Sequence, residues 1–388
     1  MNSRGESVDE LIYPICFNMR HSIELRLKGA IQEIIKISKL KGRNLDFDLS
    51  GSHDIGNIWQ FFQNNSNKLD RRFENINLSL DRTIRDIANI DATGQTFRYP
   101  LDSESKKHLV DVGGVISCRV LLDKFSELEK NLDTLHYFTG YLADEYRFET
   151  YTNNLSRADI FQIAKQLPNR TEWSSDEFKK IKSRIMSQYK ISSNEFSKAC
   201  NLIQRNYETA YFINIDLSIL GLSEDQILEI LAFWVKLNPN FRDRSPQDVS
   251  FSSIDASVFE EIIHRDAIKK ETVLALESSF TPEYLAGLNA LFYFARELDF
   301  SESYKDIYDY KLRTAKLTCN DIKEAAHNFL HIFSKCNLID NLLESLYFLN
   351  FIDFAEKIVK FYELEGVLVS LDELRSKSAF AKSDICGY

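Results

Sequence analysis

Glycine and proline are scarce in this chain, with 13 and six residues among 388. Long helices tolerate such scarcity, whereas a sandwich or barrel needs many tight turns. The hydrophobic content of 44% is enough for large cores, and the length fits two or three domains. We therefore expect an all-α protein that folds in more than one part.

Other absences exclude whole classes of protein. Six cysteines are scattered without a CxxC pair, which is typical of reduced, mostly buried thiols in a cytosol. No apolar run approaches the roughly 20 residues that span a bilayer, and the N-terminus lacks the pattern of a signal peptide. The chain has no P-loop, no glycine-rich dinucleotide turn and no GxSxG elbow. We expect a soluble, cytoplasmic protein without membrane contact, outside the commonest nucleotide-hydrolysing and hydrolase classes.

Basic residues are also fewer than acidic residues. The chain has 48 Lys and Arg against 58 Asp and Glu, which gives a net charge of −10. A constitutive, sequence-blind nucleic-acid binder needs clustered Lys and Arg, so this balance argues against one. It leaves room for a local basic site.

Apolar residues recur every three or four positions through most of the chain, and this spacing predicts helices. The first helix is expected to begin near Val8 and to end near Gly42, and Ser52 is expected to cap the second. A third helix is expected at about 69–89 and a fourth at about 123–147. The later helices are expected at 157–167, 174–189, 193–213, 223–237, 256–277, 282–298, 303–316, 319–335, 338–363 and 370–377.

Three stretches interrupt the helical pattern. Gly113-Gly114 lies between two Val-rich arms within 108–122 and predicts a small β-hairpin. The polar break at 152–156 and the Pro- and Ser-containing stretch at 238–255 predict domain boundaries. The expected domains are a helical bundle with a small β-hairpin at 1–152, a helical middle region at 153–240 and a helical C-terminal region at 256–388.

Polar side chains stand in three pieces within the N-terminal third. The pieces are the helical stripe of Arg20, His21, Glu24 and Lys28, the tetrapeptide SHDI at 52–55, and the tetrapeptide FRYP at 97–100. Glu24 and Lys28 form an i,i+4 pair in the favourable order. Taken singly, each residue fits a solvated helix face or a structural ion pair as well as it fits a functional role.

Taken together, the three pieces resemble the helical module called HEPN (higher eukaryotes and prokaryotes nucleotide-binding). In that family the first helix carries a Glu and a Lys, a second helix opens with His-Asp, and Arg-Tyr-Pro follows the third helix. The resemblance covers the N-terminal third and implies an up-and-down helical bundle that dimerises around a shared polar cleft. Active members are metal-independent ribonucleases, and many serve in bacterial toxin–antitoxin or antiphage systems.

For this chain the resemblance implies an RNA- or nucleotide-binding site at a homodimer cleft, with no cofactor and no metal. Transesterification of RNA needs a base, an acid and a cation beside the phosphate, and the polar pieces supply these types. The candidate catalytic residues are Arg20, His21, Glu24, His53 and Arg98, with Glu24 orienting a histidine. The candidate RNA- or nucleotide-binding residues are Lys28, Arg98 and Tyr99.

The sequence departs from the catalytic signature of the family, which is an Arg followed after four to six residues by a His. The late helix of the N-terminal third holds His136, but the nearest upstream arginine is Arg119, which is too far away. A non-catalytic helical interaction or adaptor module, an inactivated HEPN, is therefore the alternative to a ribonuclease. Either protein fits a bacterial conflict or defence system, with a partner protein from the same defence operon.

A third hypothesis, from another class, rests on two ExxH pairs in the C-terminal half. The i,i+3 spacing lets a Glu and a His hold one metal, and further carboxylates lie upstream of each pair. Such a set is found in helical di-iron or di-manganese bundles, which would make the chain a di-metal oxidase. The residues concerned are Glu229, Glu261, His264, Glu297, Glu324 and His327.

Overall fold

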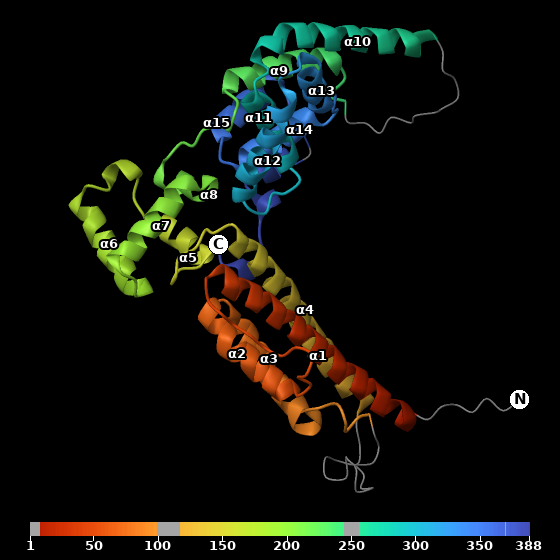
Figure 1. Cartoon of the computed structure of the whole chain (residues 1–388), viewed down its shortest axis with the longest axis vertical. Coiled ribbons are helices and arrows are strands. Elements are labelled where there is room, and N and C mark those ends of the chain that lie inside the picture. The colour runs from red at the N-terminus through yellow and green to blue at the C-terminus, as the bar shows by residue number, and fades with distance from the viewer. Residues whose placement is uncertain (1–7, 99–116, 244–255, 369) are drawn as a thin grey trace, which may run out of the picture. The chain divides into compact units, whose positions relative to one another are not determined.

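The structure, a computed structural model, describes residues 8–98, 117–243, 256–368 and 370–388. All regular structure within these ranges is helical, which confirms the expected all-α fold class. Contacts divide the chain into two compact units, one of Met1–Asp159 with Ser383–Tyr388 and one of Ile160–Lys382. Figure 1 labels their helices. Each helix in the described ranges is too short or too polar to cross a membrane.

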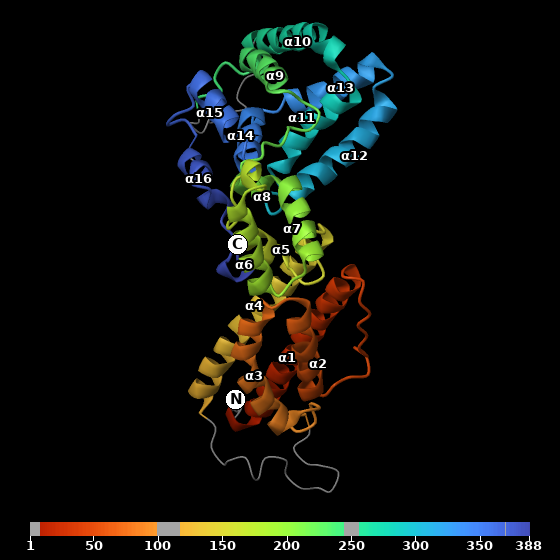
Figure 2. The same ribbon diagram turned by 90° about the vertical axis from the view of Figure 1, so that its left-hand side faces the viewer.

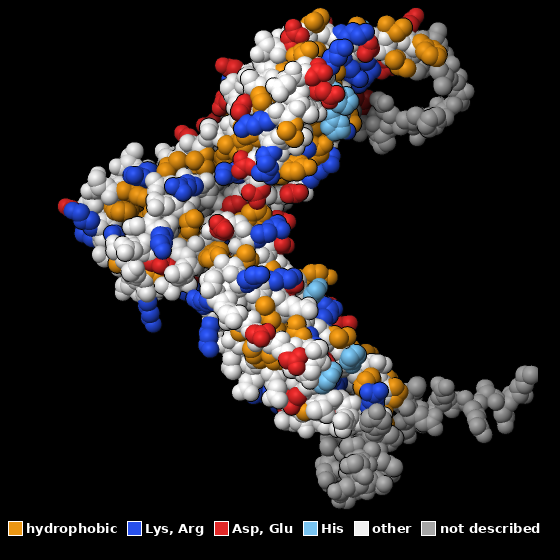
Figure 3. Space-filling view, in the orientation of Figure 1, with side chains coloured by type: hydrophobic (Ala, Val, Ile, Leu, Met, Phe, Trp, Pro, Cys, Tyr) orange, Lys and Arg blue, Asp and Glu red, His pale blue; other side chains and the backbone are white. Residues whose placement is uncertain are grey.

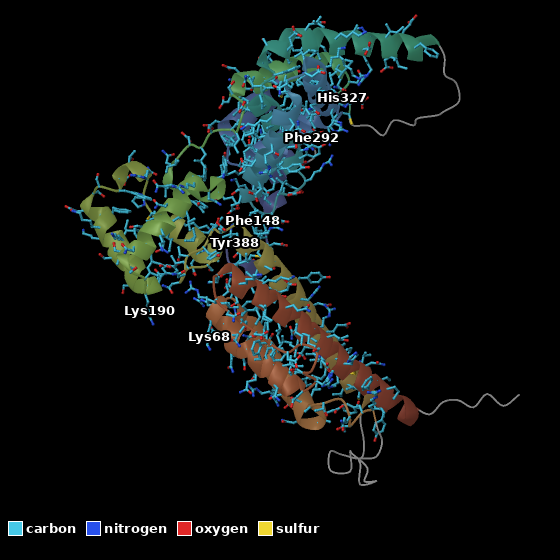
Figure 4. The ribbon with its side chains drawn as sticks, viewed as in Figure 1. Lys68, Phe148, Lys190, Phe292, His327 and Tyr388 are labelled. Atoms are coloured by element: carbon cyan, nitrogen blue, oxygen red, sulfur yellow. The ribbon has the colours of Figure 1, made fainter. Side chains whose placement is uncertain are left out.

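The first unit contains four long helices in its described part. They are α1 (Val8–Leu40), α2 (Ile55–Leu69), α3 (Phe73–Asp91) and α4 (Cys118–Arg147). Their apolar faces meet in one core, to which α2 contributes Ile58, Trp59 and Phe62 as its spacing predicts. The last residues of the chain return to this unit, where Tyr388, labelled in Figure 4, donates a hydrogen bond from Oη to Glu145 of α4 at 3.0 Å.

The first two helices run in the same direction. The start of α2 lies beside the first half of α1, where Arg20 binds the His53 carbonyl. The end of α2 lies beside the end of α1, where Lys41 Nζ donates to the Leu69 carbonyl at 3.0 Å. The connection 41–54 therefore crosses the length of the bundle (Figure 2). This crossover departs from the up-and-down order that the HEPN resemblance implies.

The ends of these helices test the predicted caps. Gly42 follows α1 with a φ of +67°, the left-handed conformation that favours glycine, as expected. The prediction of Ser52 as the cap of α2 was wrong, because Asp54 accepts a hydrogen bond from the Asn57 amide at 3.0 Å. The carboxylate lies one residue before the first helical turn, where its oxygen reaches an unpaired amide.

The predicted β-hairpin is also corrected where the structure describes it. Residues 108–116 of the expected hairpin lie outside the described ranges. Residues 118–122 of its second arm form the first turn of α4, and no strand occurs among the described residues. The helix begins here because the Ser117 side chain caps it, accepting from the Val120 amide at 3.4 Å.

The second unit gathers the remaining helices around a larger apolar core. α5 (Arg157–Ala164) leads into it from the first unit. The others are α6 (Asp176–Tyr189), α7 (Ser193–Arg205), α8 (Tyr207–Ala210), α9 (Glu224–Leu237), α10 (Ala256–Leu276), α11 (Pro282–Phe294), α12 (Glu302–Thr318), α13 (Ile322–Phe333), α14 (Leu338–Phe348), α15 (Ile352–Phe361) and α16 (Leu371–Arg375).

Two helices that were expected to be continuous are broken at asparagines. The helix expected at 193–213 stops at Asn206, whose extended backbone and side chain begin a new turn by capping α8. The helix expected at 338–363 stops at Asn350, whose φ is +66°. Asparagine adopts such conformations more readily than most residues, because its side chain competes for backbone hydrogen bonds.

The centre of the second unit is α11, which packs against α12, α13 and α14. Its residues are buried on every side of the helix, as expected for a helix inside a large core. Gly287 allows the chain to pass close by, since a Cβ there would lie 2.5 Å from the Leu220 carbonyl. Asn341 and Ser345 of α14 donate to the Phe292 and Leu291 carbonyls at 3.1 and 2.6 Å, which fixes the end of α11.

A pair of leucines on α3 tests this burial pattern. Leu80 is fully buried, whereas Leu78 is 70% exposed. We expect Leu80→Ala to lower the free energy of unfolding by roughly 2–5 kcal/mol, because it removes buried methyl groups and leaves a cavity. The matched change Leu78→Ala should stay within about 0.5 kcal/mol of the wild type. Urea unfolding followed by circular dichroism measures both, and equal losses would contradict the assigned faces of α3.

Candidate functional site

Arg20 is the centre of a polar network in the first unit. Its side chain is 2% exposed, and its guanidinium donates to the Glu24 carboxylate and to three backbone carbonyls. The carbonyls are those of His53, Asp91, at 3.3 Å from Nε, and Ala92, at 2.5 Å from Nη2. They lie at the end of α3 and just before the cap of α2. One buried side chain therefore ties α1 to both of these helix ends.

The turn after α3 is shaped around this guanidinium. Gly94 has a φ of +81°, and a Cβ at this position would lie 3.3 Å from Arg20 Nη1. The Asp91 carboxylate accepts hydrogen bonds from the Thr96 and Phe97 amides at 3.1 and 3.3 Å. Nothing in the sequence marked the carbonyls of this turn as partners of Arg20.

Glu24 shares its two carboxylate oxygens among three donors. Oε2 accepts from Arg20, and Oε1 lies 2.8 Å from Lys28 Nζ and 3.0 Å from His53 Nδ1. Burial by itself raises the pKa of Glu24, but hydrogen bonds from Lys28, Arg20 and His53 outweigh burial and hold this pKa at about 2. Glu24 is therefore an anion at neutral pH.

His53 is the exposed member of the network, with 62% of its side chain accessible to solvent. An ionised carboxylate only accepts hydrogen bonds, so Nδ1 of His53 must carry the proton in its contact with Glu24. Nε2 is then the nitrogen that can take up a proton. The sequence hypothesis that Glu24 orients a histidine thus corresponds to a hydrogen bond in the structure.

The other candidates lie around this network. His21 is exposed, and its ring stacks on Phe17 with centroids 5.9 Å apart. Arg98 is exposed on the loop that Asp91 holds, and Tyr99 lies outside the described residues. The structure therefore brings together Arg20, Glu24, Lys28 and His53, and it places His21 and Arg98 at the surface.

A cavity of about 610 Å³ lies beside Arg20 between α1, α3 and α4. Its described walls carry three cations, Arg20, Arg82 and Lys124. Each of them already contacts a carboxylate on its own helix. A phosphate in this cavity would therefore have to compete with these carboxylates for the three cations.

The two ExxH pairs of the di-metal hypothesis lie on different helices. Glu261 and His264 are exposed on α10, and Glu324 and His327 are exposed on α13. Across the described ranges, no group of three His, Cys, Asp or Glu side chains is arranged to hold a metal ion. The residues of this hypothesis therefore do not converge on one site.

No family model, curated protein or solved structure matches this chain. The assignment of a function therefore rests on the sequence pieces and on the geometry of the network.

The role of Arg20 can be tested by stability. We expect Arg20→Met to lower the free energy of unfolding by roughly 3 kcal/mol or more, because it leaves a buried carboxylate and three carbonyls without their donor. Arg20→Lys should restore little, because an ammonium does not have the five donors of a guanidinium in a planar fork. Urea unfolding followed by circular dichroism measures the losses.

The matched control for Arg20 is Arg26→Met on the same helix. Arg26 forms a half-exposed pair with Asp133, at 2.5 Å, and its loss should cost less than about 1 kcal/mol. Equal stability of Arg20→Met and Arg26→Met would mean that the network does not hold the helix ends together.

The low pKa of Glu24 predicts a pH dependence of stability. The folded pKa is about 2 and the ordinary value is 4.5, so ionised Glu24 contributes its full stabilisation above pH 4.5. This contribution is lost as the pH falls from 4.5 towards 2. We expect the stability advantage of the wild type over Glu24→Gln to shrink over this range in urea unfolding. An advantage that is independent of pH would show that the charge of Glu24 is not what stabilises the fold.

Proposed function

We propose that this chain is an HEPN-like protein of a bacterial conflict or defence system that binds RNA and cleaves it without a metal ion. The single observation that carries this proposal is the hydrogen bond from Nδ1 of the exposed His53 to the buried, ionised Glu24. A carboxylate that fixes the tautomer and orientation of an exposed imidazole is the arrangement that general acid–base catalysis needs.

In the proposed reaction His53 acts at the ribose 2′-hydroxyl. Nε2 takes the proton from the hydroxyl, and the oxygen attacks the adjacent phosphorus. The bond from phosphorus to the 5′ oxygen of the next nucleotide then breaks, and this oxygen takes a proton from an acid. The negative charge of Glu24 stabilises the imidazolium that His53 becomes. Lys28 holds the same carboxylate oxygen and so keeps Glu24 ionised.

A homodimer fits this chemistry because the reaction needs both a base and an acid. The network of a single subunit contains one histidine that is oriented by a carboxylate. A second copy would supply a second His53, one as base and one as acid. The exposed side of α1 carries Ile15 and Leu25 on either side of His21, and these apolar side chains would suit a contact between copies. Arg98 and His21 are the exposed residues that we propose for phosphate contact, and Tyr99 next to Arg98 is proposed to contact RNA.

A second candidate function, a non-catalytic adaptor that binds a partner protein of the same operon, is favoured by a different observation. Arg20 donates to Glu24 and to three backbone carbonyls, so its guanidinium is committed to the fold. A ribonuclease needs a cation that is positioned to stabilise the charged phosphorane. The missing Arg-to-His signature points the same way.

The proposal is tested by RNA cleavage with the full chain in the presence of EDTA. The substrates are bulk tRNA and a single-stranded RNA with a fluorophore and a quencher at its ends. We expect His53→Ala to lower the rate by roughly 10²- to 10⁴-fold, the usual contribution of a general acid or base. Glu24→Gln should lower the rate as well, because a neutral amide does not stabilise the imidazolium. His136→Ala, which changes an exposed histidine of α4, is the matched control.

The possible outcomes separate the two functions. Cleavage that survives in His53→Ala would place the chemistry elsewhere and would contradict the proposed site. A wild-type chain that neither binds nor cleaves RNA would support the adaptor. Toxicity on overexpression gives an independent check, since it should disappear with His53→Ala only if cleavage causes it.

A further inference from the structure

Tyr293 is the centre of a second polar cluster. This cluster belongs to the second unit, whereas the residues of the proposed function belong to the first. It lies near the end of α11, and its hydroxyl is 3.1 Å from Nε2 of His331 on α13. Nζ of Lys311, from α12, lies 4.2 Å from the centroid of the Tyr293 ring. The guanidinium of Arg296 lies 5.2 Å from the same centroid. Three neighbouring segments therefore bring an ammonium, a guanidinium and an imidazole to one tyrosine.

Two further basic side chains extend this cluster along α13. His327 lies one turn before His331, and Lys335 lies just after the end of the helix. Figure 4 labels His327 on α13, and Figure 3 shows histidine beside Lys and Arg side chains over this part of the unit. Burial lowers the pKa of His331, and Lys335, Lys311 and His327 lower it further. Burial also lowers the pKa of Lys311.

The cluster differs from most charged sites of this acidic chain. Many Lys and Arg side chains pair with a carboxylate, as Lys305 does with Asp309 at 3.6 Å on α12. Within the part of the chain that the structure describes, no carboxylate forms an ion pair with any basic side chain of the cluster. Its members are Arg296, Lys311, His327, His331 and Lys335. Arg296 and Lys311 therefore have N–H donors that can form charge-assisted hydrogen bonds with a bound anion.

An open groove of about 460 Å³ lies against the cluster, between the end of α11 and α12. Arg296 and Lys311 line it together with the rings of Tyr293 and Tyr310. The Tyr310 side chain is 59% exposed, so one face of an aromatic ligand can reach its ring. Two carboxylates, Glu297 and Asp306, also line the groove. The volume lies within the range of small-molecule sites, roughly 300–1,000 Å³.

We propose that this groove binds a nucleotide, either free or as one unit of an RNA strand. Lys311 and Arg296 contact the phosphate, to which an ammonium and a guanidinium donate charge-assisted hydrogen bonds. The base stacks on Tyr310, since aromatic side chains bind unpaired bases of any sequence in this way. Glu297 and Asp306 accept hydrogen bonds from base amino groups or ribose hydroxyls. The cations and the carboxylates of the groove thus match different parts of one ligand.

A metal ion suits this cluster less well than a nucleotide. His327 and His331 have the i,i+4 spacing of two metal ligands, but Nε2 of His331 already contacts Tyr293. The described ranges provide no third His, Cys, Asp or Glu to complete a metal group with them. Lys311 and Lys335 would also repel a cation.

The test measures binding to the full chain. The probes are a fluorescein-labelled 12-nucleotide single-stranded RNA followed by anisotropy, and AMP, ATP and inorganic phosphate followed by calorimetry. We expect the double variant Arg296→Ala/Lys311→Ala to bind the nucleotide probe at least roughly tenfold more weakly, given the usual strength of charge-assisted hydrogen bonds. Tyr310→Ala should also weaken binding, whereas Tyr310→Phe should keep the stacking surface and bind like the wild type. Lys305→Ala is the matched control on α12.

The outcomes distinguish the two sources of the nucleotide. Binding of AMP or ATP with loss in the double variant identifies a free nucleotide, and binding of RNA alone with the same loss identifies a strand. Unchanged affinity in the double variant, when its circular dichroism and thermal unfolding match the wild type, overturns the site. Inorganic phosphate that binds as tightly as AMP, with no effect of Tyr310→Ala, also overturns it. His53→Ala should leave the binding of AMP and ATP unchanged, and it should leave the loss of RNA binding in the double variant unchanged, so failure here and failure of the proposed function are separate results.

Discussion

The first unit depends on how one buried guanidinium is satisfied. Moving the charge of Arg20 out of water costs several kcal/mol unless its donors all find acceptors. The acceptors it finds are a carboxylate and carbonyls at helix ends. The carbonyls of Asp91 and Ala92 close α3, where the last C=O groups of a helix lack partners and carry partial negative charge. Arg20 therefore supplies donors to the end of α3, positions the start of α2 and holds Glu24 ionised with the same side chain.

Function in this unit is then constrained by the fold. Arg20 has the guanidinium that would best stabilise a phosphorane. Its donors are bound to carbonyls at the helix ends, so Arg20 does not reach outward. The network orients one exposed side chain, because ionised Glu24 holds the imidazole of His53 by a hydrogen bond. In the proposed reaction the exposed cations would come from Arg98, on the loop that Asp91 holds, or from a second copy of the chain. Structural and chemical roles are thus divided between neighbouring residues.

The second unit uses charge in a different way. Its core is built around α11, which is buried on all sides and fixed at its end by polar side chains of α14. The fixed end of α11 places Tyr293 beside basic side chains of three segments, and no carboxylate of the described chain forms an ion pair with them. The buried charge of Arg20 in the first unit is paired with Glu24, whereas the basic side chains around Tyr293 are the site that we propose for an anion. The net charge of −10 does not reveal where these basic side chains gather, because composition averages over both units.

The sequence by itself determined the helical class, the buried face of α2 and the Glu24–Lys28 pair, because these follow from spacings of three or four residues along one helix. It did not determine the breaks at Asn206 and Asn350, where a local asparagine conformation interrupts an apolar period that continues beyond it. Only the tertiary structure decided the crossover of 41–54 and the contact of Arg20 with a carbonyl 71 residues away. Every residue carries a carbonyl, so no letter of the sequence marks the one that a buried guanidinium will bind.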